Sequence, residues 1–148
     1  KPKDTAIYYT ALEKFPIDIV NLREFKDMLF GKSVDEREFN DIHAAPWNES
    51  SCIQENFFLH KVEIDFLEFK SNTSFDLIYF DAFAPEVQPE LWTQDFFKHL
   101  YNMLSQGGIL VTYCAKGYVK RNLKAAGFVV ESLPGPPGKR EMTRAHKL

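Results

Sequence analysis

A short apolar run that ends on a carboxylate constrains the fold more than any other stretch of this chain. The residues from Leu77 to Phe80 are apolar, and Asp81 follows them directly. A run bounded in this way is typical of a buried strand in a parallel sheet. Because ligands of open α/β sheets bind beyond the carboxyl ends of the strands, Asp81 is predicted to lie at a functional edge. The alternative, that Asp81 only caps a turn, stays open.

A loop and a helix are predicted to follow this strand. Pro85 and Pro89 shape the loop, and from Pro89 onward apolar residues recur at spacings of three and four. That period is typical of an amphipathic helix. Its members are Leu91, Trp92, Phe96, Phe97, Leu100 and Leu104.

Strands alternate with helices through most of the chain, which predicts an α/β sheet. The other predicted strands are 5–12, 57–64, 109–114, 128–133 and 139–146, and the other predicted helices are 17–29, 66–69 (a short segment) and 116–126. We interpret 32–56 as an irregular insertion with room for a short helix, and 106–108 as a turn. The proline-glycine loop at 134–138 is too short for a parallel crossover, so the last two strands should form an antiparallel hairpin.

The composition favours one globular domain over residues 1–148. Hydrophobic residues make up 45% and charged residues 26% of the chain, which argues against disorder. No apolar run approaches the roughly 20 residues that span a bilayer. Nothing resembles a signal peptide, and two cysteines are too few for a disulfide framework, so we expect a reduced, cytoplasmic protein.

Charge is distributed unevenly. The net charge is −3, yet residues 112–148 contain eight basic and two acidic side chains, which leaves −9 for the first 111 residues. A basic segment on an acidic protein favours a polyanionic partner. The alternative is that Lys120, Arg121 and Lys124 only form a solvated helix face.

Three predicted strands end on acids: Glu13, Asp65 and Asp81. Such a set suggests a nucleoside-type cofactor, because carboxylates accept hydrogen bonds from ribose hydroxyls and from an adenine amino group. Negative charge also favours a cationic ligand, such as the sulfonium of S-adenosylmethionine, and disfavours a pyrophosphate. For Glu13 the alternative is a first-turn charge that complements a helix dipole. No metal-binding, P-loop or serine-hydrolase motif is visible.

Five motifs in this order resemble those of the MnmC-type tRNA methyltransferases. They are Glu13–Pro16, Asp81–Pro85, Pro89–Thr93, Gly107-Gly108 and Gly138–Met142. The resemblance implies a Rossmann-like methyltransferase sheet with helices on both faces and a C-terminal antiparallel hairpin. It also implies transfer of a methyl group from S-adenosyl-L-methionine to the aminomethyl nitrogen of the modified wobble uridine in tRNA, in the biosynthesis of 5-methylaminomethyl-2-thiouridine.

The resemblance further implies roles for single residues. Glu13 matches an acid that binds the ribose, Asp65 an acid beside the adenine, and Asp81 the acid next to the reacting methyl group and the substrate amine. The substrate side includes Phe83, Pro85, Trp92, Lys139, Arg140 and Glu141. Tyr79, Phe83 or Trp92 can stack on a splayed anticodon base, although core packing is the alternative for each ring. A flavin-dependent oxidase, fused or separate, is the implied partner in the pathway.

One departure from the family pattern concerns the start of the sheet. The chain begins at what resembles the second strand, and its seven glycines include no G-x-G spacing. We therefore expect an N-terminally incomplete version of a longer protein, which lacks the first strand and the glycine-rich loop. If this chain is the whole polypeptide, it should bind the cofactor weakly or not at all. The alternatives are a non-catalytic RNA-binding module and an oxidoreductase-type domain, the latter disfavoured because no pyrophosphate loop is present.

Overall fold

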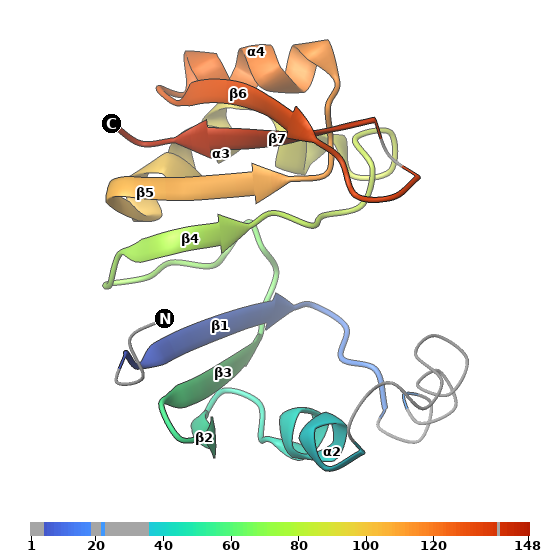
Figure 1. Cartoon of the computed structure of the whole chain (residues 1–148), viewed down its shortest axis with the longest axis vertical. Helices are drawn as coiled ribbons and strands as arrows, with labels where there is room; N and C mark the ends of the chain where they lie inside the picture. The colour runs from blue at the N-terminus through green and yellow to red at the C-terminus, as the bar shows by residue number, and fades with distance from the viewer. Residues whose placement is uncertain (1–4, 19–21, 23–35, 139) are drawn as a thin grey trace. The chain divides into compact units, whose positions relative to one another are not determined.

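The computed structural model describes residues 5–18, 22, 36–138 and 140–148, which form a mixed α/β fold (Figure 1). It divides into two compact units, Lys1–Phe69 (unit 1) and Lys70–Leu148 (unit 2). Each unit has its own sheet. The α/β class predicted from the sequence is confirmed, and the interpretation of the chain as one domain stays a prediction.

Unit 1 contains a three-stranded sheet in the order β1-β3-β2. Its strands are β1 (Ile7–Glu13), β2 (Ser50–Gln54) and β3 (Phe57–Glu63), and its described helix is α2 (Glu36–Ala44). The parallel pair β1 and β3 runs in register until Glu13 lies opposite Glu63. Rings on the two strands stack, with 5.0 Å between the centroids of Tyr8 and Phe58.

Three predictions in unit 1 need correction. The 32–56 segment is not simply irregular, because it contains β2 as well as α2, and β2 pairs antiparallel with β3. The 66–69 segment is a hydrogen-bonded turn and not a helix, since Asp65 accepts a backbone bond from Glu68 at 3.0 Å but no further turn follows. Residues 16–18 are not helical, and apart from Leu22 the remainder of the predicted 17–29 stripe lies outside the described residues.

Unit 2 contains a four-stranded sheet in the order β4-β5-β7-β6. The strands are β4 (Phe75–Tyr79), β5 (Leu104–Thr112), β6 (Val129–Pro134) and β7 (Glu141–His146), and the helices are the 3-10 helix η2 (Pro89–Trp92), α3 (Gln94–Met103) and α4 (Gly117–Ala125). β4 and β5 are parallel, whereas β7 pairs antiparallel with both β5 and β6. The predicted C-terminal hairpin is thus confirmed.

The turn predicted at 106–108 is wrong, because these residues lie inside β5. The pairing slips there: Phe75 lies opposite Leu104, but Leu77 lies opposite Ile109. Gly107 has a positive φ of 78°, which glycine adopts without steric cost. A Cβ on Gly108 would lie 2.8 Å from the backbone oxygen of Ser105. The two glycines therefore permit a bulge within a strand and do not form a connecting turn.

The apolar stripe predicted after Pro89 forms the core of unit 2. Phe97 is fully buried, and Trp92 is 1% exposed. Both rings contact Phe80 edge to face, with centroid separations of 5.7 Å for Phe97 and 4.9 Å for Trp92. The hydroxyl of Thr93 accepts from the Phe96 amide at 3.2 Å and caps α3. This core supports the end of β4, from which Asp81 extends.

Candidate functional site

The parallel pairing in unit 1 brings Glu13 and Asp65 to the same edge of the sheet. Glu13 is the last residue of β1, and Asp65 lies two residues beyond the end of β3. The amide of Ile64 donates to the carbonyl of Glu13 at 3.0 Å and continues the pairing past the strand ends. Two of the three predicted acids are therefore neighbours, as the strand-end argument requires.

Both acids already contact their own turns. Glu13 Oε1 accepts from the Phe15 amide at 2.8 Å. Asp65 Oδ2 accepts from Lys14 Nζ at 2.6 Å, and its Oδ1 accepts from the Leu67 amide at 2.9 Å. The hydrogen bond from Lys14 and then that from Leu67 lower the pKa of Asp65. Asp65 is therefore an ionised acceptor at neutral pH.

Asp81 lies in unit 2, just past the end of β4, and its side chain is exposed. The amide of Phe80 donates to the carbonyl of Val111 at 2.8 Å, so β4 remains paired up to the residue before Asp81. The loop after Asp81 is held by side chains from elsewhere. The Tyr113 hydroxyl donates to the Ala82 carbonyl at 2.9 Å, and Trp92 Nε1 donates to the Phe83 carbonyl, also at 2.9 Å.

The aromatic residues predicted to bind substrate differ in exposure. Phe83 is 70% exposed and Tyr79 is 61% exposed, so both rings are accessible for stacking. Trp92 is buried and directs its indole N–H at a backbone carbonyl, which fits the core-packing alternative. Pro85 is also buried.

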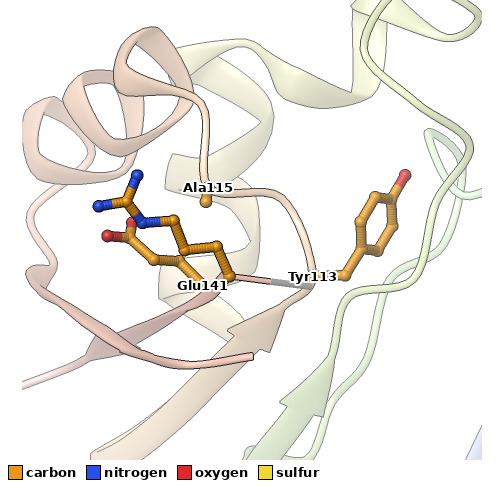
Figure 2. Close-up of a pocket in the computed structure, with 4 residues that line it drawn as sticks. Tyr113, Ala115 and Glu141 are labelled. Carbon is orange, nitrogen blue, oxygen red and sulfur yellow. The ribbon is translucent and has the colours of Figure 1, made fainter. Parts of the chain in front are cut away.

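A cavity of about 410 Å³ lies at the end of β5 and the start of β7. It is lined by Tyr113, Ala115, Arg140 and Glu141 (Figure 2). Glu141 Oε2 accepts from Lys120 Nζ at 3.1 Å, which ties α4 to this wall. Two predicted substrate residues, Arg140 and Glu141, thus share a cavity, while Lys139 lies outside the described residues.

Tyr113 and Ala115 are not among the residues predicted from the sequence to form the site. Tyr113 directly follows β5, and Ala115 follows two residues later. The strand-end rule that selected Asp81 applies equally to β5. Because neither residue is an acid, the pattern of strand-end acids does not indicate this part of the cavity wall.

Much of the positive charge in residues 112–148 is paired. Lys116 forms an ion pair with Glu86, and Arg144 Nε lies 2.6 Å from Glu131 Oε1. Arg144 and then His146 lower the pKa of Glu131 to about 2. Within this segment, four described cations form no ion pair with a described residue. Arg121, Lys124 and Arg140 are exposed, whereas Lys147 is half-buried and donates to the carbonyls of Tyr101 and Leu104.

The family model described as S-adenosyl-L-methionine-dependent methyltransferase matches residues 50–148. These residues include Asp65, Asp81 and the cavity, whereas Glu13 lies outside the match. In the part of the chain that the structure describes, no helix is long and apolar enough to cross a membrane.

The chain is also similar to curated proteins named tRNA 5-methylaminomethyl-2-thiouridine biosynthesis bifunctional protein MnmC. The protein from Pseudoalteromonas atlantica is 29% identical over 147 residues, covering 92% of this chain and 21% of the relative. The protein from a Marinomonas species is likewise 29% identical, covering 95% of this chain and 22% of the relative. This chain therefore spans about a fifth of the length of these relatives.

Among solved structures, the crystal structure of MNMC2 from Aquifex aeolicus matches with a TM-score of 0.63 and 27% identity. The match covers 95% of this chain and 43% of that one. The likeness extends over both units and not over one sheet alone.

Proposed function

Because the chain belongs to the S-adenosyl-L-methionine-dependent methyltransferase family, we propose that it methylates the aminomethyl nitrogen of the modified wobble uridine in tRNA. The observation that carries this proposal is the similarity to the MnmC proteins, which extends over 92% and 95% of the chain in the two relatives described above. The name of those relatives specifies biosynthesis of 5-methylaminomethyl-2-thiouridine in tRNA.

The carboxylates of unit 1 fit the adenosine part of S-adenosyl-L-methionine. Each carboxylate oxygen can accept more than one hydrogen bond, so Glu13 and Asp65 can keep their contacts with the turns and still accept from ribose hydroxyls and an adenine amino group. Asp65 also forms an ion pair with Lys14. A ligand that binds Asp65 must therefore share the carboxylate with Lys14 or displace the Lys14 ammonium. When bound, the cofactor supplies an electrophilic methyl group on a sulfonium.

Asp81 is proposed to act on the substrate amine. The nitrogen must present a lone pair to the methyl carbon, so the ammonium form must first lose a proton. An exposed carboxylate can take that proton or accept an N–H hydrogen bond and align the nitrogen. Bound S-adenosyl-L-methionine would supply the methyl group and, as the C–N bond formed and the C–S bond broke, would leave as a neutral thioether, while Asp81 would only take the proton or align the nitrogen.

Unit 2 offers groups of the type that bind RNA. The exposed cations Arg121, Lys124 and Arg140 can contact phosphates, and the exposed rings of Tyr79 and Phe83 can stack on a splayed base. For Glu141 we propose a role in shaping the cavity. For Trp92 and Pro85 we propose that they support the loop from beneath and do not contact tRNA.

We also propose a flavin-dependent oxidase as the partner in the pathway and a cytoplasmic location. The word "bifunctional" in the name of the relatives supports a second activity in those proteins. The resemblance seen in the sequence supports the flavin chemistry, and the presence of only two cysteines, too few for a disulfide framework, supports the compartment.

The test is methylation of hypomodified tRNA by this chain with S-adenosyl-L-methionine, followed by mass spectrometry of the wobble nucleoside. Asp81→Asn should lower turnover by about 100-fold, the usual contribution of a general base, and leave the cofactor dissociation constant near that of the parent. Asp95→Asn, at an exposed acid in the first turn of α3, is the matched control. Salt-sensitive tRNA binding without cofactor binding would instead support the non-catalytic module.

A further inference from the structure

We propose that Tyr113 is a positioning residue for methyl transfer, because its hydroxyl holds the loop that carries Asp81. The effect on methyl transfer rests on the proposed function. The contacts that support a positioning role all lie within unit 2. None of the five motifs that resemble the methyltransferase family includes this tyrosine.

The contact that carries the proposal joins two strand ends. Tyr113 follows β5 and Asp81 follows β4, two parallel neighbours in the sheet. The Tyr113 hydroxyl donates to the carbonyl of Ala82 at 2.9 Å. Ala82 is the residue after Asp81 and is 8% exposed. The bond therefore fixes the Ala82–Phe83 peptide, one residue beyond Asp81, and limits how far the loop that carries the carboxylate can move.

A second side chain fixes the next peptide of the same loop. Trp92 Nε1 donates to the carbonyl of Phe83 at 2.9 Å. The rings of Trp92 and Tyr113 pack edge to face, with centroids 6.2 Å apart and an interplanar angle of 77°. Successive carbonyls are thus held by two donors that support one another. Such packing limits how far either donor can move.

The charges around Tyr113 keep its hydroxyl a donor. Burial raises the pKa of Tyr113, and the nearby groups Cys114 and Asp81 raise it further. The phenol therefore remains protonated throughout the pH range in which an amine is methylated. Tyr113 also lines the cavity that Arg140 and Glu141 share, and its ring points away from Ala115 and Glu141 (Figure 2). Tyr113 is thus part of the cavity wall and also contacts the loop of Asp81.

The test replaces Tyr113 by phenylalanine, which keeps the ring and removes only the hydroxyl. Tyr101→Phe is the matched control, since Tyr101 lies on α3 and packs against Phe128 with centroids 5.0 Å apart. With tRNA and S-adenosyl-L-methionine saturating, kcat of Tyr113→Phe should fall by about 10- to 100-fold, the scale expected for a misplaced catalytic group. KM for tRNA and the cofactor dissociation constant should stay within about twofold of the parent values, as expected when the loss affects only alignment in the transition state.

Hydrogen–deuterium exchange of a peptide covering residues 81–88 supplies a readout that does not need activity. Exchange there should accelerate in Tyr113→Phe and match the parent in Tyr101→Phe. Unchanged exchange, or a full parental kcat, would overturn the proposal. If the parent itself transfers no methyl group, the proposed function fails, and the exchange comparison still decides whether Tyr113 holds the loop.

Discussion

Replacing Trp92 by phenylalanine separates the two interpretations of this ring. The sequence places Trp92 both in an apolar helical stripe and in a motif that implies substrate contact. In the structure the indole is 1% exposed, packs on Phe80 with centroids 4.9 Å apart, and donates to the carbonyl of Phe83. If the core interpretation is correct, Trp92→Phe should reduce stability and leave the affinity for tRNA unchanged.

The size of the loss follows from these contacts. A hydrogen bond of this type contributes about 1 kcal/mol, and the carbonyl of Phe83 would lose its indole donor. Truncating a buried tryptophan to alanine costs about 3–5 kcal/mol, and phenylalanine restores most of the ring, so about 1 kcal/mol remains for the unfilled space. The free energy of unfolding should fall by about 2 kcal/mol. Urea unfolding followed by circular dichroism measures this loss.

The control variant for this experiment is Phe83→Leu. Phe83 is 70% exposed, so its replacement should change the free energy of unfolding by no more than about 0.5 kcal/mol. It should weaken tRNA binding if Phe83 stacks on a base. The opposite pattern, with Trp92→Phe equally stable but weak in tRNA binding, would refute the core interpretation.

Two further predictions concern carboxylates. Glu13→Gln should weaken S-adenosyl-L-methionine binding about tenfold in calorimetry, the loss of about 1.4 kcal/mol, while Glu63→Gln at the end of β3 should not; an unaltered dissociation constant would restrict Glu13 to its turn. Glu131 has a pKa of about 2 in the folded chain against an ordinary value of 4.5, so the stability it contributes with Arg144 is present above about pH 4.5 and is lost as the pH falls toward about 2. The melting temperature of Glu131→Gln should lie below that of the parent at neutral pH and converge with it over this window, and a gap that persists at pH 2 would contradict the assignment.

The sequence predicted the parts of the fold that depend on local pattern. Apolar runs predicted β1, β3 and β4 as strands. The burial predicted for the Leu77–Phe80 run is only partly correct, because β1 and β4 contain exposed and half-buried residues and only β3 of the three contains buried ones. The proline-glycine loop predicted the antiparallel pairing of β6 with β7 because no crossover fits in so few residues. Both features are visible within a window of about ten residues.

Long-range pairing explains what was missed. β2 alternates between exposed and half-buried residues along Ser50–Gln54, so its sequence lacks the apolar run by which buried strands are identified. It is held by its pairing with β3, which includes a register shift between Cys52 and Gln54. The bulge in β5 is hidden for a similar reason. Two glycines predict a turn unless the partner strand is known.

The candidate site likewise combines features that local sequence predicts with contacts that depend on long-range pairing. The positions of Glu13 and Asp65 at one edge of the sheet were predictable, because strand ends can be identified from sequence and parallel pairing makes those ends neighbours. Their role in binding stays a prediction. The tie between Tyr113 and the Ala82 carbonyl spans 31 positions. A tyrosine and an alanine so far apart in the sequence give no sign that they form a hydrogen bond. The pairing of β4 with β5 brings them together.

The contacts around the strand-end residues also indicate which kinetic constant each should affect. Glu13 and Asp65 are acceptors at the edge of unit 1, where they would contact a ligand equally in the ground state and in the transition state. Loss of such contacts weakens binding without slowing the chemical step. Tyr113 is proposed to hold the loop backbone behind Asp81, so its loss should slow the chemical step and leave binding intact. We therefore expect Glu13→Gln to raise the cofactor dissociation constant without lowering kcat, and Tyr113→Phe to lower kcat without raising that constant. This result would separate cofactor recognition from alignment of the amine. If both variants changed the same constant, the two strand-end sites would not have distinct roles.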